Sequence, residues 1–466
     1  MAREVAEAEA RRFGRAAGLL SIGIGSAGLL TYVYFSLASH NLNRVEYGEL
    51  VVLWSAVFIT ISTLFRPVEQ LLSRTIAERQ ASRQPIGQPL RVAARIQLGV
   101  AAAFALCALA LRGPLEDQLL SGSETLYWIL VAAALAFGAS FFARGFLAGS
   151  RHFALYALLL LAESTARVSF ALAVAVGIAS GQTAVALGIV AAPLLSLTVI
   201  PLAIAARALA RRRAGPPPPA PTPPPPAPPS GQPEFTLAAG GGFAAAVLLI
   251  MFSEQALLNA GPLLVRASEG AAAAGFIFNV LMIARAPLVL FQAVATSLLP
   301  HLTRLRSSAD ARDADAFRLS VRLTIGAVCA FAAAVGLIVL IAGPELMQLA
   351  FGENFDYDRA GLLIVTVGMG FYLAAVTLNQ AALAQGQVRR AAACWVGCAL
   401  AFVGWSLLPV LDEFRRVEVG FAGAAVLLCG LLYLLYRRPR VRPEDVVQPD
   451  SPQEIEARLA AADEAS

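Results

Sequence analysis

Long apolar runs separated by short polar segments dominate this chain. The hydrocarbon core of a bilayer is about 30 Å thick, and an α-helix needs around 20 apolar residues to cross it. Runs of that length recur along the whole sequence, and each one predicts a membrane-spanning helix. The predicted spans are 17–39, 48–67, 92–111, 125–146, 153–178, 183–206, 236–262, 271–299, 319–342, 360–384, 388–411 and 417–436. The pattern therefore predicts an all-α membrane protein with twelve transmembrane helices in two six-helix bundles.

The composition agrees with this prediction and excludes other classes. Hydrophobic residues make up 58% of the chain and charged residues only 14%, whereas a soluble domain is about 45–50% apolar. The net charge of +5 comes from arginines beside apolar runs and not from one basic patch, so we expect no nucleic-acid partner. The five cysteines lie within apolar runs and no histidine cluster accompanies them. We expect no metal site, no cofactor and no catalytic residues, and hence a protein that is not an enzyme.

The distribution of arginine predicts the orientation. Short cytoplasmic loops retain positive charge, and translocated loops do not. With a cytoplasmic amino terminus, most arginines of the loops fall on the cytoplasmic side. The exceptions are Arg44, Arg112, Arg266, Arg359, Arg415 and Arg416. We therefore predict a multi-pass protein of the cytoplasmic (inner) membrane with both termini in the cytoplasm.

A proline-rich segment divides the chain. Eleven of the fourteen residues of 216–229 are proline, which is incompatible with a helix and typical of a stiff polyproline II spacer. At about 3.1 Å per residue it would span about 43 Å. We predict an amino-terminal lobe at 1–206, a cytoplasmic linker at 207–234, a carboxy-terminal lobe at 235–436 and a disordered cytoplasmic tail at 437–466.

Two local patterns recur six spans apart, in the same order. Tyr-Gly at 47–48 opens the second span, and Ala-Gly at 274–275 opens the eighth. The turn LAGSR at 147–151 follows the fourth span, and LAQGQ at 383–387 follows the tenth. Because six is even, duplicated halves enter the membrane in the same orientation. The repeat predicts a pseudo-two-fold axis along the membrane normal and a cavity between the lobes.

These segments also resemble a known family. The segment AGFIFNVLMIARAPLVLFQAVATSLLPHLTRL, from Ala274 to Leu305, resembles the eighth-span signature of polysaccharide and lipid-linked oligosaccharide flippases of the multidrug/oligosaccharidyl-lipid/polysaccharide (MOP) superfamily. EYGEL from Glu46 and LMQLAFGENFDYDRAG from Leu346 are similar to that family's span-two entry and to its loop before span ten. The resemblance implies a flippase that moves the head group of a lipid-linked glycan across the membrane by alternating access. We expect membrane lipid, lipid-linked glycan and glycan-assembly enzymes as partners of a monomeric protein.

Charged residues inside the spans are the candidate site residues, because a buried charge costs several kcal/mol unless it faces a partner or a wet cavity. Arg285 has no acid three or four residues away, so another helix, water or an anionic substrate must balance it. Glu163 and Arg167 are four residues apart in one span and face the same side. Either Arg167 binds a phosphate and Glu163 a coupling proton, or the two form a self-neutralised pair that locks packing. We name Arg285 and Arg167 as substrate-binding candidates, since guanidinium groups bind phosphate bidentately.

Glu254 is the second ion-coupling candidate beside Glu163. It adjoins Gln255 in the seventh span, ahead of a Gly-Pro break at 261–262, which is typical of a polar, bendable helix. Arg66 and Arg144 lie at cytoplasmic span ends, where we expect them to extend to the interface as anchors.

Two alternatives to the flippase remain open. A drug/cation antiporter of the same superfamily needs an acid deep in an amino-terminal helix, and the first span contains none. A membrane scaffold without transport activity would share the same layout. The choice of glycan and of coupling ion stays open at this point.

Overall fold

The computed structural model describes residues 2–82, 84–205, 237–285 and 311–437, and these are almost entirely helical. The elements are α1 (Ala2–Asn41), α2 (Arg44–Leu64), α3 (Arg66–Ala81), α4 (Gly87–Ala110), the π-helical turn η1 (Pro114–Leu119), α5 (Glu124–Gly149), α6 (Phe153–Ala175), α7 (Gly181–Leu197), α9 (Leu237–Glu269), an apolar helix Ala271–Arg285, α11 (Ala311–Phe351), α12 (Arg359–Ala384), α13 (Val388–Ser406) and α14 (Glu413–Arg437).

The predicted fold class is confirmed. Among the described residues, eleven helical segments are long and apolar enough to cross a membrane. The helix 271–285 is the beginning of the predicted eighth span, whose remainder lies outside the described residues. Large apolar side chains such as Leu98 in α4 and Ile341 in α11 are about two-thirds exposed, as expected for helices that face lipid.

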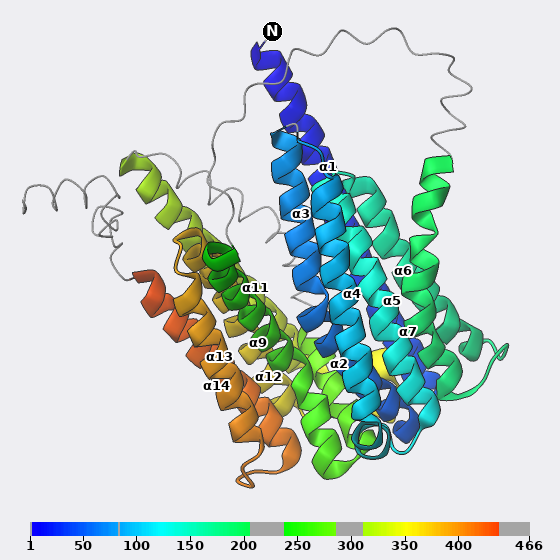
Figure 1. Cartoon of the computed structure of the whole chain (residues 1–466). Helices are drawn as coiled ribbons and strands as arrows, with labels where there is room; N and C mark the ends of the chain where they lie inside the picture. The colour runs from blue at the N-terminus through cyan, green and yellow to red at the C-terminus, as the bar shows by residue number, and fades with distance from the viewer. Residues whose placement is uncertain (1, 83, 206–236, 286–310, 438–466) are drawn as a thin grey trace, which may run out of the picture.

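The helices form two bundles. In the first, α6 packs against α1 and α7, and α5 packs against α3 and α7; in the second, α12 packs against α11 and α14, and α13 packs against α9 and α14. Figure 1 shows α1–α7 on the right and α9–α14 on the left. The predicted linker, 207–234, and the tail beyond residue 437 lie outside the described residues.

The two bundles meet at one end of the molecule. We call the end that carries the amino terminus the proximal end, and the end that carries the α1–α2 connection the distal end. Near the distal end, Tyr47 of α2 donates a hydrogen bond to Asn279, and Phe35 of α1 packs on Phe278 with ring centroids 4.6 Å apart. In Figure 1 the bundles approach each other at the bottom and diverge toward the labelled amino terminus.

The lobes approach each other closely at two glycines that the internal repeat makes equivalent. A Cβ atom on Gly48 would lie 1.8 Å from the carbonyl oxygen of Ala271, and one on Gly275 would lie 3.3 Å from the Cα atom of Gly48. When equivalent residues of a two-fold arrangement contact each other, the axis passes through their contact. The crossing of α2 with the helix 271–285 therefore marks the predicted pseudo-two-fold axis.

The second recurring pattern folds into the same turn in both lobes. After α5 the residue Arg151 has a φ of 57°, and after α12 the residue Gly386 has a φ of 76°. Each donates its N–H to the carbonyl oxygen three residues back, and the next residue donates to the carbonyl five residues back. Both turns are thus Schellman motifs. The structure pairs Arg151 with Gly386, one residue away from the match of the letters.

The second predicted span continues further than expected. We placed its end at residue 67, but a change of direction at Phe65 leads directly into α3, which runs to residue 81. Pro67 lies in the first turn of α3, where its missing N–H leaves no hydrogen bond unmade. Val68, Leu72 and Ile76 recur every four residues on one face and pack against α4 and α5. The polar residues between them hid this helix from the count of apolar runs.

Candidate transport sites in the two lobes

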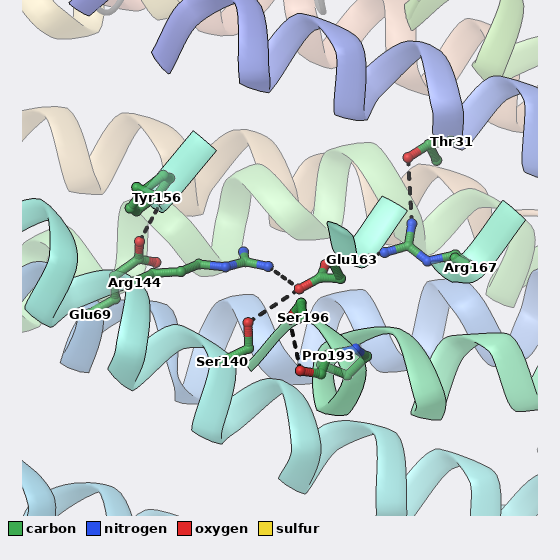
Figure 2. Close-up of polar contacts among 9 residues, drawn as sticks. All are labelled: Thr31, Glu69, Ser140, Arg144, Tyr156, Glu163, Arg167, Pro193 and Ser196. Carbon is green, nitrogen blue, oxygen red and sulfur yellow. Dashed lines mark hydrogen bonds and ion pairs between the residues drawn. The ribbon is translucent and has the colours of Figure 1, made fainter. Parts of the chain in front are cut away.

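Charged residues of α5 and α6 meet inside the amino-terminal lobe. Glu163 forms an ion pair with Arg167, with 3.2 Å between Oε1 and Nη2. Its other oxygen, Oε2, accepts hydrogen bonds from the Nη2 group of Arg144 and, at 3.2 Å, from the hydroxyl of Ser140. Figure 2 shows Glu163 between the two guanidinium groups. We call Arg144, Glu163 and Arg167 the amino-terminal charge cluster.

The position of Arg144 corrects the sequence analysis. We expected it to anchor the end of its span at the interface, but it is 8% exposed and pairs with Glu163. The helix continues to residue 149, so more than a turn of α5 lies beyond Arg144. Gly145 also draws α5 close to α3, because a Cβ atom there would lie 2.7 Å from the carbonyl oxygen of Glu69. The guanidinium therefore turns toward Glu163, its buried partner, and the snorkelling prediction for Arg144 is wrong.

Protein groups surround the guanidinium of Arg167. Its Cζ atom lies 4.7 Å from the ring centroid of Trp54, a cation–π contact. Its Nη1 group donates to the Thr31 hydroxyl at 3.5 Å, and its Nη2 group is paired with Glu163 as described. The predicted pairing on one helix face is present. Arg167 must release part of this shell before it can bind an anionic substrate.

A second carboxylate lies beside the cluster. Glu69, in the first turn of α3, accepts a hydrogen bond from the Tyr156 hydroxyl of α6, with 2.8 Å between the oxygens. Figure 2 shows this pair next to Arg144. The sequence analysis missed Glu69 because it placed this stretch outside the spans. The spacing of the apolar residues in α3 is the signal that would have placed it on a packed helix.

The carboxy-terminal lobe holds a different arrangement around Arg285. The Nη1 group of Arg285 donates to Oδ1 of Asn259 at 3.3 Å, and Nδ2 of Asn259 donates to Oε1 of Gln255 at 2.9 Å. The Nε and Nη2 atoms of Arg285 are buried and have no hydrogen-bond partner within the described residues. In the same part of the chain no carboxylate forms an ion pair with it. We call Gln255, Asn259 and Arg285 the carboxy-terminal polar cluster.

Glu254 lies next to this cluster in sequence, on α9. Its side chain is partly exposed. Tyr372 of α12 interacts electrostatically with both Glu254 and Arg285. No group of three or more His, Cys, Asp or Glu side chains that could hold a metal ion occurs in the described ranges.

Helix α1 connects the two clusters. Its residue Thr31 accepts the hydrogen bond from Arg167, while the hydroxyl of its neighbour Tyr32 donates to the carbonyl oxygen of Met282 at 2.5 Å. Tyr32 is also within electrostatic range of Arg285. Of the four predicted site residues, Glu163 and Arg167 form an ion pair in the amino-terminal lobe. Glu254 and Arg285 both belong to the carboxy-terminal lobe, and no ion pair joins them in the described residues.

An exposed ion pair stabilises the distal end of the carboxy-terminal lobe. Asp358 caps α12 by accepting the N–H of Gly361 at 3.1 Å, and it pairs with Nη2 of Arg415 at 2.6 Å. Partial burial by itself would raise the pKa of the Asp358 carboxyl. The hydrogen bonds from Arg415 and from the backbone of Gly361 outweigh it and lower the pKa below its usual value.

No protein-family profile matches this sequence, and no curated protein matches it. Solved structures do match over nearly the whole chain. The MATE transporter VcmN of Vibrio cholerae is 17% identical, with a TM-score of 0.60 over 91% of this chain and 96% of that one. A multidrug resistance MATE transporter of the MOP superfamily, solved in an inward-facing conformation, is 14% identical, with a TM-score of 0.65 over 90% and 97%.

The fold is that of MATE transporters. The likeness extends to a eukaryotic member, AtDTX14, which is 12% identical with a TM-score of 0.60 over 97% of this chain and 98% of that one. The MATE fold consists of twelve helices in two bundles. The described residues of this chain form two bundles with eleven membrane-length helical segments and the shorter apolar helix 271–285. At these identities the comparison concerns the fold, and the side chains of the two clusters must be interpreted from their own chemistry.

Proposed function

We propose that this protein is a flippase that carries a lipid-linked oligosaccharide or polysaccharide precursor across the cytoplasmic membrane by alternating access. Its transporter fold supports the class of activity. One observation supports the choice of cargo. The Nε and Nη2 donors of Arg285 are buried and have no hydrogen-bond partner in the described part of the chain. Leaving such donors unsatisfied costs about 1–3 kcal/mol each. A phosphate group of a lipid carrier satisfies two of them at once through bidentate hydrogen bonds.

Arg167 and the two acids take secondary roles in this proposal. Arg167 contacts the cargo only after Glu163 releases it, and Glu163 and Glu254 remain the candidates for ion coupling. In this proposal the proximal end, where the two bundles diverge in Figure 1, faces the cytoplasm, the side on which lipid-linked precursors are assembled. Glycan-assembly enzymes on that side are the expected partners.

A drug/cation antiporter is the second candidate, because a structural neighbour is described as a multidrug resistance transporter. Such a cargo needs an acid deep inside a helix of the amino-terminal lobe, whereas Glu69, which forms no ion pair within the described residues, lies in the first turn of α3. The span Ser21–Asn41 of α1 contains no acid, and Glu163 is engaged by two arginines. These observations favour the anionic cargo.

The substitution Arg285→Ala tests the proposal in cells that depend on this protein for a surface glycan. We expect export of the glycan to be lost while the level of the protein in the membrane is unchanged. Arg389→Ala, which removes an exposed arginine at the start of α13, is the matched control and should export normally. Unchanged export by the Arg285→Ala variant would overturn the proposed role.

A further inference from the structure

The proposed function leaves Glu69 without a role. Its carboxylate is half-buried between α3 and α6, and its one hydrogen bond to a side chain in the described part of the chain is the one it accepts from Tyr156. In the same residues no arginine lies within ion-pair distance of it. Glu69 and Glu163 are therefore two acids in one lobe with opposite surroundings, one with a phenol and the other with two guanidinium groups.

Arg144 lies between these two acids. Its Nη2 group is bonded to Glu163, its Nε atom is buried without a partner within the described residues, and Glu69 is within its electrostatic range. Figure 2 shows the side chain of Arg144 extending from beside Glu69 toward Glu163. A change of charge on Glu69 therefore acts on Arg144, and through Glu163 on Arg167.

The cost of adding a proton differs between the two acids. Protonation of Glu163 would leave the guanidinium groups of Arg144 and Arg167 buried near each other without a counter-charge, and breaking a buried pair in this way is strongly destabilising. Protonation of Glu69 breaks no ion pair of the described residues. The other charged or titratable groups that face Glu69 are Arg66 of its own helix, Arg144 of α5, and Tyr156 and Glu163 of α6.

We propose that Glu69, in place of the earlier candidate Glu163, is the proton-binding group of the amino-terminal lobe, and that Arg144 transmits its charge to Glu163 and Arg167. When Glu69 is ionised, it attracts Arg144 away from Glu163 and strengthens the pairing of Glu163 with Arg167. When Glu69 is protonated, Arg144 stays on Glu163, which weakens the hold on Arg167. The assignment of this proton to transport rests on the proposed function, whereas the binding of the proton itself does not.

Infrared difference spectroscopy of the purified full-length protein in lipid tests the site without any cargo. As the pH is lowered, the carboxylic C=O absorption of the protein should include one band that the Glu69→Gln variant lacks, while the bands of the other Asp and Glu residues appear in both proteins. Tyr156→Phe keeps the acid but removes the hydrogen bond to its ionised form, so the midpoint of the band should move up by about one pH unit. Ser140→Ala, which removes the equivalent hydroxyl from Glu163, is the matched control and should leave the midpoint unchanged.

Two outcomes would overturn the assignment. One is persistence of the band in the Glu69→Gln variant, and the other is a midpoint that moves in Ser140→Ala but not in Tyr156→Phe. The result is independent of the Arg285 assay. Normal glycan export by Arg285→Ala would overturn the proposed cargo but not the proton site. Persistence of the band in Glu69→Gln would overturn the proton site but not the proposed cargo.

Discussion

The two lobes each bury an arginine, but they surround it differently. In the amino-terminal lobe, Arg167 has a carboxylate, a hydroxyl and an aromatic ring around it, and one buried donor, Nε, without a partner among the described residues. In the carboxy-terminal lobe, Arg285 has one amide oxygen and two buried donors without partners among the described residues. A guanidinium that is already paired contributes to the structure, and one with open donors is prepared for an anion. Residue type and depth alone would not separate these two roles.

Removal of the shared carboxylate is the strongest way to break this comparison. Glu163→Ala leaves Arg144 and Arg167 buried without a counter-charge, and we expect it to lower the free energy of unfolding by about 3–5 kcal/mol. Thermal unfolding of the purified protein in detergent measures the effect. Ser140→Ala removes only one neutral donor to the same carboxylate, so it should cost about 1 kcal/mol. Equal effects of the two substitutions would mean that the charge cluster is not what stabilises this lobe.

The lobe crossing provides a second test, because it depends on close packing and not on charge. Gly48→Ala places a methyl group where the carbonyl of Ala271 lies, and such overpacking costs about 1–3 kcal/mol. Gly275→Ala, with its nearest contacts beyond 3.0 Å, should cost less. Gly397→Ala in α13 meets nothing within 4 Å and serves as the control in the same unfolding assay. A neutral Gly48→Ala variant would contradict the crossing.

The smallest expected effect concerns Asp358, an ionised side chain that pairs at the surface. Because its pKa is lowered in the folded protein, the stabilisation is present above the unfolded value and is lost as the pH falls through the folded value. The carboxylate is half exposed, so Asp358→Asn should cost only about 0.5–1 kcal/mol at neutral pH. Unfolding measured across pH should show this difference vanish in acid. If the stability difference between the wild type and Asp358→Asn grew toward low pH, it would contradict a lowered pKa of Asp358 in the folded protein.

Hydropathy was sufficient to predict the helices because lipid-facing spans need long apolar runs whatever their neighbours. Hydropathy did not predict α3, because only every fourth residue on its packed face, Val68, Leu72 and Ile76, is a large apolar one. For the same reason the sequence analysis did not place Glu69 inside the packed lobe. The pairing of Glu163 with Arg167 was predictable from a spacing of four residues on one helix. The pairing of Arg144 was not, since its partner Glu163 lies on the next helix. The sequence showed that no acid lies within one helical turn of Arg285, but it could not show Asn259, because that amide comes from another helix.

The central claim is that Arg285 binds the phosphate of an anionic lipid carrier. Binding of an isoprenoid pyrophosphate to the purified protein, followed as a ligand-dependent rise in unfolding temperature, tests it most directly. The wild type and Arg389→Ala should be stabilised alike by this lipid, and Arg285→Ala should bind it at least about tenfold more weakly, as expected for the loss of a charge-assisted hydrogen bond. Unweakened binding by Arg285→Ala, or stabilisation of the wild type by an organic cation but not by the lipid, would contradict the account.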